Sequence, residues 1–130
     1  MSDEINVVAS IRCANGNFEL PRVGASGFKS DQTTVGRGGP ASVTATTAAA
    51  GIEIDVSTMT APGICRLTNI EADGGATILL GWHDGASYVQ TDELKPGEST
   101  VFRFSLGGSV TRRCRVASGT ADLDVVVLED

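Results

Sequence analysis

Residues 51–57 read GIEIDVS, and this stretch decides the predicted fold. Its apolar residues, Ile52, Ile54 and Val56, alternate with polar ones. A period of two is typical of a strand with one face in a core and the other in solvent. Together with similar segments before and after it, the stretch predicts about eight short strands, with a regular β core over 51–130. Such a pattern predicts an all-β fold, an antiparallel β-sandwich or a jelly-roll-like barrel. The similar segments are 5–13, 64–71, 77–82, 87–90, 99–105, 109–117 and 122–128.

Turn residues separate the predicted strands. In Ala61-Pro62-Gly63 the proline fixes φ and the glycine suits a position with positive φ. Asp73-Gly74-Gly75 has the composition of a second turn, and Pro96-Gly97 lies at the centre of a third. These signals predict short connections between antiparallel strands.

Two hairpin registers follow from matching residue types across the turns. A four-residue loop at 83–86 pairs Gly81 with Tyr88, so that an aromatic ring covers a bare backbone. Near the C-terminus, the best match pairs Cys114 with Val125 on the core face. A one-residue slip would turn every side chain to the wrong face, so this match predicts that the last two strands form a hairpin.

The N-terminal part is less regular. Residues 5–13 alternate like a strand, and Pro21 restricts a weak strand at 18–23 to an edge position. Residues 24–40 are rich in glycine and show no apolar period, which predicts a long exposed loop or arm. After this arm, Val43, Ala45 and Thr47 suit a flat strand, and a short helix at 46–50 is the alternative.

The bulk composition limits the classes of function. A chain of 130 residues has room for one core, so we expect a single β domain over 1–130. Its formal charge of -6 argues against nucleic acid as a partner, because phosphate binding depends on Lys and Arg. The chain starts with acidic and polar residues and has no long apolar run. We therefore expect that it is not secreted by a signal peptide and has no membrane-spanning segment.

The three cysteines are widely spaced and include no CxxC pair. Cys13, Cys65 and Cys114 are therefore predicted to be reduced thiols that serve as small core residues. A pairing of Cys65 with Cys114 is the alternative. A reduced compartment fits a protein made and assembled in a cytoplasm.

Nothing in the sequence predicts a catalytic, metal or cofactor site. His83 is the single histidine and lies in a predicted hairpin loop beside a turn-forming Asp-Gly. Acidic pairs such as Glu53 with Asp55 occupy the polar side of alternating strands, where carboxylates are simply solvated. The glycine cluster around Arg37 has neither the GxGxxG nor the phosphate-loop spacing.

Charged residues gather on the last strands. Their simplest interpretation is cross-strand pairing, such as Arg115 opposite Asp124. The alternative is a basic stripe that docks on an acidic neighbour, with Arg112 and Arg113 as contact residues. The group consists of Arg103, Arg112, Arg113, Arg115, Asp122 and Asp124.

The sequence from Gly51 onward resembles a group of small virion proteins of tailed bacteriophages. The resemblance covers about the last three-fifths of the chain. It rests on an acidic-apolar strand, two Pro-Gly turns, an Leu-x-Asn strand, a Phe-Arg strand and an acidic terminus. These motifs are 52–56, Pro62-Gly63, Leu67-Thr68-Asn69, Leu94-Lys95-Pro96-Gly97-Glu98, Phe102-Arg103-Phe104 and Leu128-Glu129-Asp130.

The resemblance implies a β-sandwich or jelly-roll module of the virion. The first expectation is a capsid decoration (cement) protein, a homo-oligomer such as a trimer that binds between major capsid subunits. The arm at 24–40 would order on binding, with Phe28, Lys29 and Arg37 among its contacts. A tail, collar or fibre-attachment component of the same particle is the alternative.

A hypothesis from another class is a carbohydrate-binding β-sandwich. Trp82, His83 and Tyr88 lie near one predicted hairpin end and would form its ligand platform. No cofactor is expected under any of these hypotheses.

Overall fold

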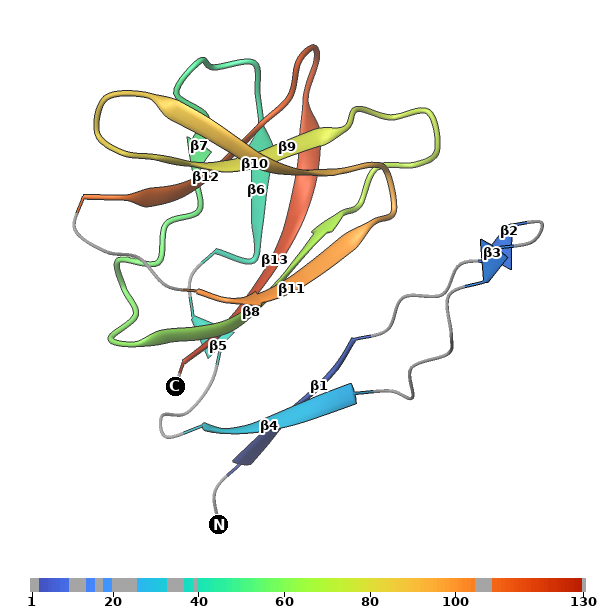
Figure 1. Ribbon diagram of the computed structural model, residues 1–130. Coiled ribbons are helices and arrows are strands. Elements are labelled where there is room, and N and C mark those ends of the chain that lie inside the picture. The colour runs from blue at the N-terminus through green and yellow to red at the C-terminus, as the bar shows by residue number, and fades with distance from the viewer. Residues whose placement is uncertain are drawn as a thin grey trace. The chain divides into compact units, whose positions relative to one another are not determined.

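Figure 1 shows the computed structural model of the chain, which describes residues 3–9, 14–15, 18–19, 26–32, 37–38, 40–104 and 109–129. The chain separates into two compact units, Met1–Thr33 and Thr34–Asp130. All regular structure within the described ranges is β-strand, which confirms the predicted all-β class. Within those ranges no helix has the length and apolarity needed to span a membrane.

The second unit is a sandwich of two antiparallel sheets. One sheet has the order β10-β9-β12-β7, and the other has the order β11-β8-β13-β5, with β6 also paired to β13. This arrangement confirms the predicted sandwich of about eight strands. The strands are β5 (Arg37–Gly38), β6 (Ser42–Ala45), β7 (Ile52–Glu53), β8 (Pro62–Asn69), β9 (Ile78–His83), β10 (Tyr88–Leu94), β11 (Ser99–Arg103), β12 (Thr111–Arg115) and β13 (Ala121–Glu129).

Alternation of side chains along the strands fills a single core between these sheets. On β13, Leu123, Val125 and Val127 point inward and are 0% exposed. Burial of one such side chain contributes about 1.5 to 3 kcal/mol, so the shared core dominates the stability of the sandwich. The core consists of Val43, Ala45, Ile54, Val56, Cys65, Leu67, Ile78, Leu80, Leu94, Phe104, Cys114, Val116, Ala121, Leu123, Val125 and Val127.

The alternation at 52–56 is confirmed by burial. Ile54 and Val56 are buried, and the neighbouring polar residues Glu53, Asp55 and Ser57 are exposed. Ladder pairing with β12 is limited to Ile52 and Glu53, and the N–H of Ile54 donates to the carbonyl of Arg112 at 2.9 Å. The stretch is therefore a short edge strand whose apolar side chains continue into the core.

The sandwich begins before the predicted start at residue 51. β6 confirms the flat strand, with Val43 and Ala45 buried and paired to Leu123 and Ala121 of β13. The alternative helix at 46–50 does not form, because the chain makes a turn there, closed by a hydrogen bond from the N–H of Gly51 to the carbonyl of Ala48 at 2.9 Å.

The first hairpin forms, but its register differs from the prediction. His83 pairs with Tyr88, and Gly81 pairs with Gln90 rather than with Tyr88. The carboxylate of Asp84 accepts hydrogen bonds from the N–H groups of Ser87 and Ala86, both at 2.8 Å, and these bonds lower the pKa of Asp84. The turn therefore starts at Asp84, one residue later than expected, and the cross-strand register shifts with it.

The predicted C-terminal hairpin is wrong. β12 pairs with β9 and β7, whereas β13 pairs with β8, β6 and β5. The connection between β12 and β13 therefore crosses from one sheet to the other. Cys114 and Val125 matched in the sequence because both face the same core, although they do so from opposite sheets.

Two of the three predicted turns are confirmed, and one is not. Gly74 and Gly97 adopt positive φ values of 87° and 82° in their turns. Pro62, however, opens β8 and is paired with Glu129, while the carbonyl of Gly63 accepts a hydrogen bond from Phe104 at 2.7 Å. Proline is tolerated there because it is the first residue of the strand.

The first unit contains two small antiparallel ribbons. β1 (Asp3–Ala9) pairs with β4 (Ser26–Gln32), and β2 (Ala14–Asn15) pairs with β3 (Phe18–Glu19). The strand β4 corrects part of the loop predicted at 24–40, because backbone pairing does not require alternating apolar residues. Residues 10–13, 20–25, 33–36 and 39 lie outside the described residues.

A buried asparagine connects three segments of the sandwich. Asn69, 0% exposed at the end of β8, donates from its side-chain amide to the carbonyls of Ala76 and Leu94, each at 2.9 Å. Its side-chain oxygen accepts the N–H of Glu71 at 3.1 Å. Because β8 and Leu94 belong to different sheets, this one amide joins the sheets and the loop between β8 and β9.

We expect Asn69→Ala to lower the free energy of unfolding by about 2 to 4 kcal/mol, because buried backbone groups would lose their partners. Urea unfolding measures the change, with an unaltered m-value showing that it acts on the native state. Thr68→Ala is the matched control, since it removes only an exposed 2.8 Å contact with the hydroxyl of Ser99. Equal midpoints for the two variants would contradict the role given to Asn69.

Candidate functional site

Three side chains lie on the core-facing side of one sheet but outside the buried core. Trp82 pairs with Val89 on one side and with Arg112 on the other, so the three residues share one face. Two positions along, the same face carries buried Leu80 and Cys114. Trp82 and Val89 are both 39% exposed, which is unusual for large apolar side chains on a core face.

Phe102 of the opposite sheet completes this surface. The guanidinium of Arg112 lies 4.5 Å from the centre of the Phe102 ring, a cation–π distance. Phe102 in turn stacks on buried Phe104, with 6.0 Å between ring centres. We call Trp82, Val89, Phe102 and Arg112 the sandwich-end patch, which both sheets contribute to.

The composition of the sandwich-end patch is typical of a protein interface. Tryptophan, phenylalanine and arginine are enriched where proteins bury surface against one another, and they supply most hot spots. Arg112 is already held against Phe102, so it loses little side-chain freedom on binding. The arrangement suits docking of an apolar surface and offers no set of groups for bond making or breaking.

Tyr88 lies on the opposite, outer face of the same sheet. Its hydroxyl donates to the carbonyl of Leu79 at 2.8 Å, and the guanidinium of Arg115 lies 5.8 Å from its ring centre. A Cβ at Gly51 would lie 3.1 Å from the ring, so a glycine with φ of 71° lets the tyrosine pack closely. Burial raises the pKa of Tyr88 to about 12.

Gly81 is required for a reason other than the predicted cover by Tyr88. A Cβ at this position would collide with the carbonyl oxygen of Val89 on the neighbouring strand. The close approach adjoins a register shift between Gln90 and Asp92, where β10 bulges. Only glycine fits this approach without moving one of the two backbones.

The expected ligand platform does not form, because its residues do not share one face of the sheet. His83 and Tyr88 are register partners and lie on the outer face, while Trp82 lies on the core face, because successive residues of a strand point to opposite sides. The imidazole Nδ1 of His83 accepts the N–H of Gly85 at 3.1 Å within the hairpin loop. His83 is thus engaged in its turn, and Tyr88 is packed against the sheet.

The other predicted contact residues are distributed over both units. In the backbone register of the first unit, Phe28 is opposite Val7 and Lys29 is opposite Asn6. Arg37 of β5 is opposite Leu128. Of the named contact residues, Arg112 alone belongs to the sandwich-end patch.

Arg113 has a structural role on the outer face of the same sheet. Its Nε donates to the hydroxyl of Thr111 at 2.9 Å, and its Nη1 donates to the carbonyls of Ala50 and Gly51 at 3.3 Å. It therefore holds the turn that precedes β7.

The predicted pairing of the β12 arginines with the β13 aspartates is wrong, because the two strands belong to different sheets. Asp124 lies 3.5 Å from Arg66 of neighbouring β8, and both side chains are well exposed. Asp122 accepts the hydroxyl of Thr44 of β6 at 2.7 Å. Each aspartate thus interacts with a strand that pairs with β13.

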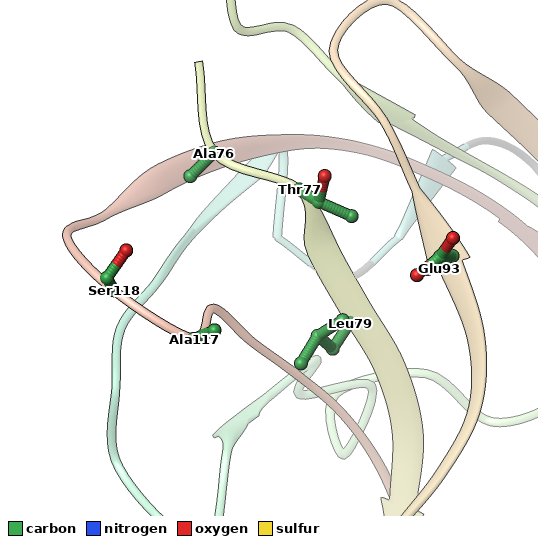
Figure 2. A pocket seen from close by; sticks show the side chains of 6 residues that line it. All are labelled: Ala76, Thr77, Leu79, Glu93, Ala117 and Ser118. Atoms are coloured by element: carbon green, nitrogen blue, oxygen red, sulfur yellow. The ribbon is translucent and has the colours of Figure 1, made fainter. Parts of the chain in front are cut away.

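A cavity of about 300 Å³ opens at one end of the sheet that contains β9 (Figure 2). Figure 2 shows Thr77 and Leu79 along one chain segment, Glu93 on a neighbouring segment to one side, and the small Ala117 and Ser118 to the other side. Its lining offers one carboxylate and two hydroxyls but no histidine, cysteine or lysine to act with them.

Two of the three cysteines are buried free thiols, as predicted. Cys65 and Cys114 are 1% and 0% exposed and form no disulfide with each other. Burial raises the pKa of each thiol to about 12. Cys13 lies outside the described residues. Among the residues that the structure does describe, no group of three or more His, Cys, Asp or Glu side chains could hold a metal ion.

Comparison with models of known protein families found no match to this chain, and searches of curated proteins and of solved structures found none either.

Tyr88 is the single tyrosine of the chain, so its ionisation can be followed directly by near-ultraviolet absorbance. We expect half-ionisation near pH 12 rather than near 10, the value for an exposed tyrosine. Because the folded-state pKa is raised, the stability that the neutral phenol contributes is complete below about pH 10 and is lost as the pH rises through the folded value. Tyr88→Phe should show no absorbance change, and a wild-type midpoint near pH 10 would contradict the packed position.

Proposed function

We propose that this chain is a non-enzymatic structural protein that works by packing against other proteins through the sandwich-end patch. The observation that carries the proposal is the exposure of Trp82 and Val89 beside Arg112, which is stacked on Phe102. Docking would remove the remaining apolar surface of these side chains from water, at about 25 cal/mol per Å². The energy of binding then comes from a few well-placed side chains.

We further propose that the partner is another protein of a bacteriophage particle. The motifs shared with small virion proteins support this assignment, among them Leu67-Thr68-Asn69 with its buried asparagine. The specific form of the proposal is a capsid decoration protein, assembled in the host cytoplasm, that binds between major capsid subunits and stabilises the head. Mechanical cementing of this kind requires surface burial and no chemistry.

Imaging of particles with and without this protein tests the assignment. A decoration protein predicts loss of pegs from the shell and earlier leakage of the genome on heating. An intact, equally heat-stable shell with an incomplete tail would instead assign the protein to the tail, collar or fibre attachment. Particles unchanged in both head and tail would reject a virion role.

We expect Trp82→Ala to weaken binding to purified undecorated shells by at least about thirtyfold, the effect of losing a hot spot of about 2 kcal/mol. Sedimentation of the protein with the shells measures this loss. Ile70→Ala is the matched control, because Ile70 is 56% exposed but lies outside the sandwich-end patch. Equal loss of binding in the two variants, both folded by circular dichroism, would reject this surface as the docking site.

A further inference from the structure

Arg112 carries the positive charge of the sandwich-end patch, and its guanidinium lies 4.5 Å from the centre of the Phe102 ring. In the part of the chain that the structure describes, no carboxylate forms an ion pair with it. Arg66, by contrast, lies 3.5 Å from the carboxylate of Asp124. The Phe102 ring attracts the charge of Arg112 but supplies no carboxylate oxygen. The planar fork of N–H donors is thus left for water or for a ligand.

The carboxylates on the strands and the hairpin turn of the same sheet are engaged or face away. Asp84 accepts two N–H groups of its own turn, each at 2.8 Å. Asp92 accepts the hydroxyl of Thr91 at 2.9 Å. Glu53 and Glu93 lie on the outer face, since their register partners Arg113 and Leu79 do. An anion for Arg112 therefore has to come from another molecule.

Arg112 also lies at the margin of the core. Cys114, two residues further along β12, is 0% exposed, and Cys65 is the register partner of Phe102. Burial raises the pKa of the Cys65 thiol, and the positive charge of Arg112 opposes that rise. A partner that covered the patch with apolar side chains alone would take this charge out of water without a counter-charge, which is strongly unfavourable. The covering surface must therefore bring a carboxylate.

The strand register determines where the rest of such a partner would lie. Val89, Trp82 and Arg112 form one row across β10, β9 and β12, with the apolar side chains at one end and the basic one at the other. Neighbouring strands are about 4.8 Å apart, so the row is about 10 Å long. In an extended segment, side chains two residues apart are separated by about 7 Å. A carboxylate on Arg112 would thus place the second next side chain over Trp82 and Val89.

We propose that the sandwich-end patch binds an acidic-apolar segment of the partner protein. An aspartate or glutamate of this segment pairs with Arg112, and an apolar side chain two residues away covers Trp82 and Val89. The chain as a whole has a formal charge of -6, so this unpaired basic position directs an acidic segment to one place on the molecule. The inference rests on the proposed docking function of the patch and names the chemistry of its partner.

Trp82 is the single tryptophan of the chain, so its fluorescence reports on the patch. The probe is the blocked peptide acetyl-Ala-Asp-Ala-Leu-Ala-amide, in which the aspartate carries the one charge. The same peptide with asparagine in place of aspartate should bind the wild type about tenfold more weakly, because one charge-assisted hydrogen-bonded pair is lost. Equal binding of the two peptides, or an unchanged Trp82 emission with the aspartate peptide, would overturn the inference.

Arg112→Gln completes a double-mutant cycle with the two peptides. If the guanidinium contacts the carboxylate, this variant should bind both peptides equally weakly, so that the tenfold preference disappears. Arg112→Lys keeps the charge but not the planar fork, and should lose part of the preference. A purely structural role for Arg112 would weaken both peptides and leave the preference unchanged in both variants, which would reject the contact.

Arg66→Gln is the matched control, because Arg66 is an exposed arginine outside the sandwich-end patch that pairs with Asp124. This variant should keep the whole preference for the aspartate peptide. Loss of the preference in Arg66→Gln as well would show that the peptide senses overall charge, and would reject Arg112 as the specific contact.

Binding to undecorated shells separates this inference from the proposed function. Shells bound with equal affinity by the wild type and by Arg112→Gln would reject the acidic contact and leave docking through Trp82 intact. A wild type that prefers the aspartate peptide but binds no particle would reject the virion role and leave the recognition of an acidic segment intact.

Discussion

The side-chain amide of Asn69 is the polar interaction on which the arrangement of the sandwich depends. Its two donors and its acceptor satisfy backbone groups of Ala76, Leu94 and Glu71, which come from three different segments. The backbone of Asn69 adds hydrogen bonds to Gly97 and Glu98 of the next turn. The free-energy cost of removing a buried polar group from water is offset only when all its hydrogen bonds are made. Asn69 therefore fixes these segments in one arrangement.

Glycines at two positions determine what each face of the β9 sheet presents. Gly81 lets the backbone of Val89 approach closely, next to the bulge of β10. Gly51 lets the ring of Tyr88 pack on the outer face. The outer face of the β9 sheet is thus covered by Tyr88. On the core-facing side, Trp82 and its neighbours lie beyond the buried core. Trp82 and Val89, each 39% exposed, are thereby left partly open on the core-facing side of this sheet.

The edge strands of the two sheets differ in regularity. Bulged, charged β10 resists further pairing, whereas regular β11 adjoins the patch through Phe102.

Local chemistry made part of the fold predictable. The turns at Gly74 and Gly97 follow from residues that favour positive φ, and the burial of Ile54 and Val56 follows from alternation. The register of the first hairpin was not predictable, because it depends on which residue caps the turn, and Asp84 does so with its own side chain.

The sequence by itself determined which residues face a core, since a period of two is imposed by the backbone of every strand. It could not determine which sheet each strand joins. Cys114 and Val125 share a core but belong to opposite sheets, and alternation is the same in both cases. Trp82 and Arg112 were each named from sequence for different functions, and the tertiary structure makes them partners. Pairing depends on contacts between residues far apart in the chain, so only the folded structure decided where the sandwich-end patch lies.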